Sequence, residues 1–510
     1  MNHLNDANSG RDADWRYLWP VLALALAARV AVGLSTDSVA HPDVLFQYLE
    51  QAHRLVFGYG IIPWEYVFGI RSWLVPGCIA LLLKCLAVAG LSRPDEYVPI
   101  VKIAFCCVSL SLPWSMYRIA QALFDEIAAR FSLLAGAFWY ELINVAHQPL
   151  VDALSAYAFF AALVCLFAGD TRTKRILFGL LIGLALDLRF QLAPMLGIAY
   201  LIAAYRWRRE VFAAVMATAA MVIALGALDA YTWGIWFSSV VVNLQLNLVS
   251  NVANRFGTNP FWFYGGSLTL LSLGLAEVGA AALLVHWRKA WPLILFGLAD
   301  VGAFSLIGHK EPRFVFASIP VYLIGLGVLA AAVWRSDVPR TARSLGNGRP
   351  AAIALSLAVG LISLGGLFYL LPFERMAIHH PLIWRDDSTQ AYLYLSRQND
   401  VAGVIDDSGT DWDNTGGFYL LHHPVPLYGP VLTRHVMAVV RRAPALYASH
   451  WILPAGHGAP EGFHPLARIG GLEIWRRRRD LPVTPAAPGY TRRAPFPVHL
   501  TARPTVSPRW

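Results

Sequence analysis

Apolar runs of about 20 residues recur along the chain and alternate with short loops that carry most of its charges. A helix of that length crosses the ~30 Å hydrocarbon core of a bilayer. With the N-terminus inside, most clusters of Arg and Lys fall on the inner face, in line with the positive-inside rule. This threading predicts an all-α polytopic membrane protein with about 11 transmembrane helices. The first of them, Leu18–Leu34, is expected to be an uncleaved anchor.

Two apolar stretches do not fit a simple span. Ile176–Ala204 keeps the basic cluster that follows it inside only if it forms two short helices, broken near Asp187–Arg189. Non-helical backbone at membrane depth is tolerated beside a polar cavity. Trp73–Gly90 carries Lys84 near its middle, and a crossing there would put the preceding loop and the later candidate sites on opposite faces. We therefore expect Trp73–Gly90 to be re-entrant or interfacial.

The polar segments suggest a domain organisation. We expect a cytoplasmic N-terminus at 1–17 and a transmembrane domain at 18–372, with a first extracytoplasmic loop at 35–97 and a second large loop at 230–267. The tail at 373–510 changes character, because VAGVID alternates like a strand and is followed by an acidic turn and a second strand-like run. This pattern predicts a small extracytoplasmic α/β domain, and its simplest role is to cover the membrane part.

The composition agrees with a membrane protein. The 510 residues are 57% hydrophobic and 14% charged, whereas a soluble domain carries roughly a quarter charged residues. The net charge of +9 resides in short loops, which is a topology signal and not a nucleic-acid surface. Only five of the 41 basic residues are lysines, and no Asn-x-Ser/Thr sequence occurs. We interpret both features as favouring a bacterial inner membrane over the endoplasmic reticulum.

The polar loop His41–Gly77 concentrates ionisable groups beside the first membrane helix. Such groups lose hydration at a bilayer, so a cluster of them usually has a function. Asp43 lies next to His41 where the span meets the loop, and it is the strongest candidate. Glu50 and His53 follow on the polar side of a predicted helix, whose apolar stripe contains Leu45, Leu49, Ala52 and Val56. Either the polar side faces a cavity, or this is an ordinary interfacial helix whose charges face water.

A compact block of three cationic groups, HKEPRF at 309–314, lies between two apolar runs. Arg offers a fork of donors to phosphate oxygens, whereas Lys and His offer point donors. Snorkelling of one Lys or Arg accounts for a single charge near a headgroup, but not for this block. We therefore expect His309, Lys310 and Arg313 to bind a phosphate at the membrane surface.

Three weaker signals accompany these two. Asp152 opens a span after His147, and it is either a substrate ligand or only a helix-dipole partner. Arg189, at the expected helix break, is a second phosphate candidate, or it simply pairs with Asp187. The loop at 243–266 combines amides with aromatic rings, which suit sugar recognition, although an interfacial aromatic belt is the commoner cause of Trp and Tyr there.

The sequence contains no Walker A loop, GxSxG elbow, zinc-ligand spacing or Rossmann fingerprint. Its chemistry must therefore come from carboxylates and cations near a bilayer surface. Such groups suit transfer from a lipid phosphate, in which a carboxylate takes a proton from an acceptor hydroxyl and cations stabilise the departing phosphate.

The residues of the two main blocks resemble a known family. The first loop, HPDVLFQYLEQAHRLVFGYGIIPWEYVFGIRSWL, and the block HKEPRF are similar to those of the Alg9-type and GPI-type mannosyltransferases, glycosyltransferase family 22 of the GT-C superfamily. LDLRFQ resembles the family's Arg-containing helix break, and the segment NLQLNLVSNVANRFGTNPFWFYGG its Asn-rich, Tyr-Gly loop. The resemblance runs from about residue 18 to residue 372.

The resemblance implies inverting transfer of a hexose, typically mannose, from a polyprenyl-phosphate sugar, with no nucleotide sugar and no required cofactor. It implies that Asp43 is the general base and that His309, Lys310 and Arg313 hold the donor phosphate. Arg189, in the segment that resembles the Arg-containing break, is a further candidate for binding that phosphate. No metal ligands are implied. The family commonly has Asn-x-x-Glu near the fourth span, where this chain has QPLVD, so the resemblance does not extend to Asp152. Further candidates for substrate contacts are Glu50, His53, Trp64, Glu65, Arg71, Asp152, Asn243 and Tyr264.

Two other function classes use the same residue types. A transporter or flippase of a lipid-linked sugar would bind with the same cations and broken helices without catalysis, although inverted repeats, which would support it, are not visible. A transferase that modifies a membrane phospholipid with a group other than hexose is the third. The leading hypothesis is a glycosyltransferase whose partners are membrane lipid, a polyprenyl-phosphate sugar donor and a glycan or glycolipid acceptor, and not nucleic acid.

Overall fold

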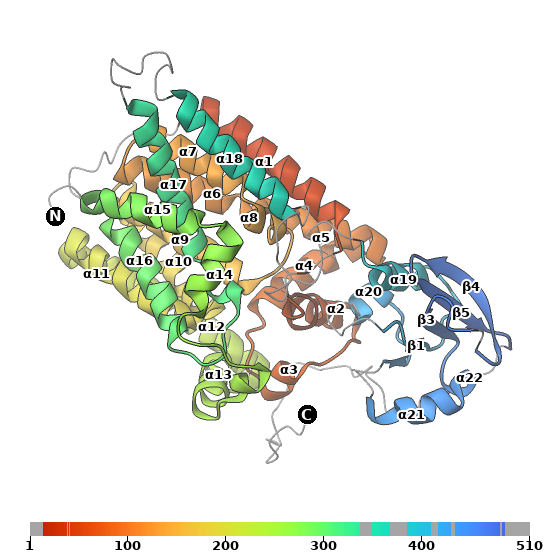
Figure 1. Ribbon diagram of the computed structural model, residues 1–510. Helices are drawn as coiled ribbons and strands as arrows, with labels where there is room; N and C mark the ends of the chain where they lie inside the picture. Colours follow the sequence, from red (N-terminus) through yellow and green to blue (C-terminus); the bar gives the residue numbers. More distant parts are fainter. Residues whose placement is uncertain are drawn as a thin grey trace. The chain divides into compact units, whose positions relative to one another are not determined.

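The computed structural model describes residues 14–37, 39, 41–336, 349–367, 385–409, 417–429, 434–458, 460–479 and 482–484. The chain forms two compact units, each assembled from segments that are distant in sequence (Figure 1). Unit 1 contains Met1–Gly33, Ala104–Ala227 and Val240–Leu382, and unit 2 contains Leu34–Ile103, Leu228–Ser239 and Ile383–Trp510. The first polar loop and the C-terminal tail thus belong to one unit. The acidic turn at 410–416, the basic loop at 337–348 and the tail beyond 484 lie outside the described residues.

Unit 1 is helical. Its helices are α6 (Ser111–Leu123), α7 (Glu126–Phe138), α8 (Tyr140–Asn144), α9 (Val151–Phe167), α10 (Arg172–Leu188), α11 (Ala193–Trp207), α14 (Phe263–Ser272), α15 (Leu275–Val285), α16 (Trp287–Ser305), α17 (Ser318–Arg335) and α18 (Arg349–Leu367), with the short turns η3 (Phe190–Leu192), η4 (Arg208–Glu210), η5 (Gln245–Val249), η6 (Val252–Phe256) and η7 (Pro312–Val315). Residues of both units occur in α1 (Trp15–Ser35), α5 (Pro94–Ser109), α12 (Val211–Trp233) and α13 (Ser238–Leu244).

Small residues and one buried cation hold the helices of unit 1 together. Gly279 of α15 and Gly325 of α17 lie so close that a Cβ on either would collide with backbone of the other helix, which is the small-residue packing typical of membrane helices. Arg29 of α1 is buried, and its guanidinium donates to the carbonyl oxygens of Gly136 (3.0 Å) and Ala137 (2.5 Å) at the end of α7. Those carbonyls have no partner within their own helix, so the arginine satisfies them.

The helix break expected near Asp187–Arg189 is confirmed. Helix α10 ends at Leu188, Arg189 takes a non-helical conformation (φ −154°, ψ 89°), and η3 then leads into α11. Pro194 stands near the start of α11, where its missing N–H costs nothing. The break presents Arg189 at the end of α10 in unit 1, and its side chain is buried.

The first loop of unit 2 folds into η2 (Val44–Leu49, a π-helix), α2 (Glu50–Phe57), α3 (Trp64–Phe68) and α4 (Leu74–Val88). Gly58 and Gly69, at φ 85° and 72°, end α2 and α3 in the left-handed conformation. The alternative of an interfacial helix whose charges face water does not hold, because every residue from Val44 to Arg54 is buried. Polar side chains in η2 and α2 must therefore find partners inside the protein.

The C-terminal part of unit 2 is the expected small α/β domain. Its sheet has the order β2-β1-β3-β5-β4, with β1 (Val404–Asp406) parallel to β2 (Leu427–Tyr428) and β3 (His450–Pro454). Strands β4 (Phe463–Ile469) and β5 (Leu472–Arg477) complete it as an antiparallel hairpin. VAGVID forms β1 as predicted, but the second strand-like run divides into helix α20 (Gly417–Leu421) and β2. The remaining helices are α19 (Asp387–Leu395), α21 (Arg434–Arg442) and α22 (Pro444–Tyr447).

Several helices are long enough to span a membrane. Among the described residues, five helices are long and apolar enough to cross a bilayer, or six if the pair α14–α15, bent by 103°, counts as one span. The five are Trp15–Ser35, Pro94–Leu123, Phe190–Trp233, Ser318–Arg335 and Arg349–Leu367. Other expected spans, such as α9, form shorter apolar helices. The polytopic helical architecture is confirmed, whereas the number of crossings and the re-entrant nature of α4 stay predictions.

Candidate active site

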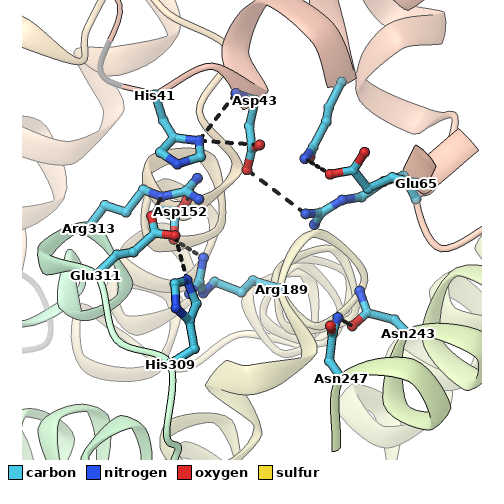
Figure 2. Close-up of polar contacts among 12 residues, drawn as sticks. His41, Asp43, Glu65, Asp152, Arg189, Asn243, Asn247, His309, Glu311 and Arg313 are labelled. Atoms are coloured by element: carbon cyan, nitrogen blue, oxygen red, sulfur yellow. Dashed lines mark hydrogen bonds and ion pairs between the residues drawn. The ribbon is translucent and has the colours of Figure 1, made fainter. Parts of the chain in front are cut away.

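Asp43 of unit 2 lies between two basic groups. Its carboxylate is 3.2 Å from Nδ1 of His41 and 3.9 Å from a guanidinium nitrogen of Arg71, and its side chain is 14% exposed. Figure 2 shows Asp43 directed toward His41 at the start of the first-loop helices. Asp43 thus has basic groups on two sides and keeps some access to solvent.

Glu65 supplies a second carboxylate to this loop. Nε2 of Gln47 donates to its Oε1 at 2.7 Å, and the hydroxyl of Tyr66 donates to the Gln47 carbonyl at 2.8 Å. Burial, reinforced by the charge of Asp43, raises the pKa of Glu65 to about 7. Trp64 precedes Glu65 in α3 and is half-buried, with its ring 6.3 Å from that of Phe68. Of the first-loop candidates, Asp43, Arg71 and Glu65 therefore form one electrostatic group.

A second group of charges lies in unit 1 around Asp152. The carboxylate of Asp152 is 1% exposed, forms an ion pair with Arg189 and lies 3.5 Å from Nη1 of Arg313. These residues come from α9, the break after α10 and the turn η7. A buried carboxylate between two guanidinium groups keeps both of them fixed. Asp152, which the sequence left undecided between a ligand and a helix-dipole partner, thus brings the two arginine candidates together.

Glu311 extends this group toward solvent. Its carboxylate accepts from Nε of Arg313 at 2.5 Å and lies 2.8 Å from Nε2 of His309, whose Nδ1 is 2.8 Å from the Gly257 carbonyl. The hydrogen bond to Glu311 raises the pKa of His309. The two arginines and two carboxylates cancel in charge, so a protonated His309 leaves the group at +1. This group (His309, Glu311, Arg313, Asp152 and Arg189) is called the arginine cluster below, and Figure 2 shows its side chains converging.

Aromatic rings support Arg189. Its guanidinium carbon lies 4.9 Å from the ring centre of Phe304 and 4.8 Å from that of Phe314. Such cation–π contacts favour the charged form and orient the guanidinium plane. Tyr264 of α14 is buried and lies within electrostatic range of Arg189 and Glu311. Glu311 and the two phenylalanines were not predicted from sequence, although Glu311 stands between cations in the HKEPRF block.

Lys310 and Asn243 are placed differently from the cluster. The ammonium of Lys310 donates to the carbonyls of Asn259 (2.8 Å) and Ile307, while Nδ2 of Asn259 donates to the Lys310 carbonyl at 3.1 Å. This reciprocal contact joins two loops, which favours a structural role for Lys310 over phosphate binding. Asn243 accepts a hydrogen bond from Asn247 at 2.7 Å, so the amide pair stays a candidate for sugar hydroxyls (Figure 2).

Glu50 and His53 are directed into unit 2. Backbone N–H groups of Ile61, Phe418 and Tyr419 donate to Glu50, and burial raises its pKa to about 7. Nε2 of His53 lies 3.1 Å from Nδ1 of His422. Burial lowers the pKa of His53 to about 3, so the imidazole is neutral. Both side chains are occupied by contacts within the protein, and these contacts support a structural role.

No group of three or more His, Cys, Asp or Glu that could hold a metal occurs among the described residues.

The region that contains both groups has a counterpart among known proteins. A model of the Alg9-like mannosyltransferase family matches residues 19–381, which include every candidate residue described above. The chain belongs to the Alg9-like mannosyltransferase family. The resemblance found in the first loop and in HKEPRF is thereby confirmed.

Individual members of the family match a shorter stretch. GPI mannosyltransferase 3 of Yarrowia lipolytica is 31% identical over 314 residues, which cover 59% of this chain and 60% of that protein. Mannosyltransferase APTG1 of Arabidopsis thaliana is 27% identical over 319 residues, covering 60% and 58%. The chain thus spans about three fifths of the length of these curated relatives.

The fold of this family member extends further than its sequence match. The crystal structure of ArnT from Cupriavidus metallidurans bound to undecaprenyl phosphate superposes with a TM-score of 0.61 at 13% identity, covering 92% of this chain and all of that chain. At such low identity the likeness concerns the fold alone.

The His309–Glu311 contact makes stability depend on pH. Because its folded pKa is raised, protonated His309 stabilises the protein fully below pH ~6.5, and this contribution is lost as pH rises through the raised value. Glu311→Gln should remove the charged hydrogen bonds, cost about 1.5–3 kcal/mol per bond lost, and move the loss to lower pH. Thermal midpoints of the purified protein from pH 5.5 to 9 measure this, with His309→Gln as the baseline. Identical pH profiles in wild type and His309→Gln would contradict it.

Proposed function

We propose that this chain is an inverting glycosyltransferase that moves a hexose, mannose in the first instance, from a polyprenyl-phosphate donor to a lipid-linked or surface glycan acceptor. The observation that carries the proposal is the arginine cluster of unit 1, which holds two guanidinium groups on one buried carboxylate inside the region matched by the family. Fixed guanidinium forks are the groups best suited to phosphate oxygens.

On the donor side, the cluster has the charge that the reaction needs. With His309 protonated it carries +1, which matches the single negative charge of a sugar–phosphate–lipid diester. The leaving group is a phosphate monoester and gains negative charge as the bond to the sugar breaks. Among the cationic members, Arg313 and His309 are the more exposed, with side chains 16% and 14% exposed against 9% for Arg189, and we assign the phosphate contacts to them. Arg189 is held in place by Asp152 and the two phenylalanines. It adds to the positive electrostatic potential at the phosphate without contacting it.

On the acceptor side, we assign the general base to Asp43. The acceptor hydroxyl oxygen attacks the anomeric carbon, the bond from that carbon to the phosphate oxygen breaks with its electron pair moving to phosphate, and the hydroxyl proton goes to the Asp43 carboxylate. Attack from the side opposite the leaving group inverts the configuration. Arg71 and His41 keep the Asp43 carboxylate oriented.

The site is proposed to work at the outer face of a bacterial inner membrane, as the threading of the basic loops suggests. A transporter or flippase of a lipid-linked sugar is the alternative. The family match supports the enzyme, because the matching family and the relatives that match part of this chain are named for mannosyl transfer. No metal or cofactor is assigned a role in the proposal.

A deletion strain tests this function directly. Mass spectrometry of its lipid-linked and surface glycans should reveal an acceptor that lacks one hexose. Purified wild-type protein with a polyprenyl-phosphate mannose should restore that hexose to the isolated acceptor. An unchanged glycan profile would count against the enzyme, accumulation of a complete but inward-facing glycolipid would favour the flippase, and loss of a non-hexose group would favour the phospholipid-modifying transferase.

A further inference from the structure

A single buried carboxylate in the first loop connects two distant parts of unit 2. Glu50, 1% exposed, accepts hydrogen bonds from the backbone N–H groups of Ile61 (2.7 Å), Phe418 (3.1 Å) and Tyr419 (2.8 Å). Ile61 lies in the same loop, but Phe418 and Tyr419 belong to α20 of the C-terminal domain. When Glu50 is ionised, these three N–H donors form strong, charge-assisted bonds with its carboxylate, and burial keeps water from replacing them.

The backbone on both sides is shaped to fit this carboxylate. A Cβ added to Gly417, at φ 53°, would lie 2.7 Å from Oε2 and 2.9 Å from Cδ of Glu50. A Cβ on Gly60 would collide with the side chain of Arg54 and lie 3.0 Å from Oε1 of Glu50. Both positions therefore need glycine for the close approach, and Glu50 has little room to shift.

Neighbouring side chains join the same two segments. The hydroxyl of Tyr97 donates to the carbonyl of Tyr419. Nδ1 of His53 faces the Tyr59 carbonyl at 3.1 Å, so it carries the proton, and Nδ1 of His422 then donates to Nε2 of His53 at 3.1 Å. The rings of Phe57 and His422 meet edge to face with centres 4.6 Å apart. The connection is thus a built interface with Glu50 at its centre.

Only one side of this interface lies within the region that matches the family. It ends at residue 381, so Glu50 lies inside the matched region whereas Phe418 and Tyr419 lie outside it. Backbone N–H groups are present whatever the side chain. A C-terminal domain with a different sequence can therefore still supply the two backbone N–H groups that donate to Glu50.

We infer that Glu50 is a positioning residue and that the C-terminal domain, rather than only covering the membrane part, holds the helix that begins at Asp43. This inference rests on the proposed function, because it assigns the held residue the role of base. Asp43 directly precedes η2, which continues without interruption into α2 at Glu50. The seven residue steps from Asp43 to Glu50 span roughly 10 Å of helix. A shift at Glu50 is therefore transmitted to Asp43, and a displacement of about 1 Å in a reacting group can cost up to ~100-fold in rate.

The first test replaces Glu50 by glutamine in the full-length protein. The glutamine side chain has nearly the shape of glutamate but carries no charge. Its –NH₂ group cannot accept a hydrogen bond from the backbone N–H that it faces. Amide hydrogen exchange at Ile61, Phe418 and Tyr419 should accelerate about 10- to 100-fold, as expected for the loss of charged hydrogen bonds. kcat for sugar transfer should fall about 10- to 100-fold. The affinity for the donor lipid, measured with unreactive polyprenyl phosphate as the probe, should not change, because the arginine cluster lies in unit 1.

The second test approaches the same carboxylate from the C-terminal domain. Gly417→Ala places a methyl group against Glu50, whereas Gly409→Ala is a matched control. Both glycines have positive φ (53° and 75°), but a Cβ on Gly409 meets nothing within 4 Å. Gly417→Ala should reproduce the fall in kcat with unchanged donor affinity, and Gly409→Ala should lose only the stability that the strained conformation costs.

The outcomes separate this inference from the proposed function. Unchanged exchange and unchanged kcat in both Glu50→Gln and Gly417→Ala would overturn the inference, as would an equal loss of donor affinity and kcat, which indicates general unfolding. If wild type transfers no sugar but the three amides exchange faster in Glu50→Gln, the connection between the loop and the C-terminal domain stands. The proposed function then fails alone.

Discussion

Asp43→Asn is expected to reduce sugar transfer by about 10²–10⁴-fold while leaving donor binding intact, since this is the usual contribution of a general base. Asparagine has nearly the same shape but cannot take the proton of the acceptor hydroxyl. The contacts to His41 (3.2 Å) and Arg71 (3.9 Å) lose their ionic character, yet the loop keeps its fold because the hydrogen bonds of Glu50 do not involve Asp43. The loss should therefore appear in kcat.

Turnover of a polyprenyl-phosphate sugar by purified protein measures this effect, together with equilibrium binding of polyprenyl phosphate. Asp95→Asn is the matched control, because Asp95 belongs to the same unit and also pairs with arginines, Arg93 and Arg397, but with a side chain 26% exposed against 14% for Asp43. It should retain near wild-type turnover. Full transfer activity in Asp43→Asn would refute the assignment of the base.

Arg313→Gln is expected to weaken binding of the donor phosphate about 10- to 100-fold, the equivalent of one or two charge-assisted hydrogen bonds. Arg313 links the cluster, since it contacts both Glu311 (2.5 Å) and Asp152 (3.5 Å). Its removal deprives a buried carboxylate of one cation and makes the cluster net neutral even when His309 is protonated. An incoming phosphate then finds no excess of positive charge.

The measurement is the dissociation constant of polyprenyl phosphate and the KM of the donor, compared with the KM of the acceptor, which should not change. Arg335→Gln is the control, because Arg335 also belongs to unit 1 and pairs with a carboxylate, that of Asp125, but is 46% exposed at the end of α17. A donor affinity that is unchanged in Arg313→Gln, or reduced equally in Arg335→Gln, would remove the arginine cluster from the donor side.

The sequence was most informative where charged residues lie within or next to apolar segments, because a bilayer disfavours charges there. Three observations, the basic cluster after Trp207, the charges at Asp187–Arg189 and the packed HKEPRF block, allow few arrangements in a bilayer. Those constraints predicted the break before η3, which is present, and made Arg313 and Arg189 separate phosphate candidates. That both guanidinium groups contact Asp152 was not predicted. Hydrophobic spacing likewise predicted the strand at VAGVID.

The same sequence patterns could not predict which atoms each polar side chain would contact in the folded protein. Glu50 looks like a residue on the polar side of a helix, but two of its three donors lie 368 and 369 residues further along the chain. Lys310 carries the same charge as Arg313, yet its ammonium is bound to backbone carbonyls of another loop. A local pattern reports that a group is ionisable, whereas its role depends on which distant atoms the fold brings to it.

Arg29 has a consequence for how the protein is made. Its two carbonyl partners follow it by 107 and 108 residues, at the end of α7. At a synthesis rate of roughly 5–20 residues per second, the ribosome needs about 5–20 s to produce them. During that interval α1 carries an arginine whose insertion penalty is about 2.5–3.5 kcal/mol at mid-helix. We expect α1 to be held at the insertion machinery until α7 emerges, so that biogenesis pairs the first membrane helix with a later one before either is released into lipid.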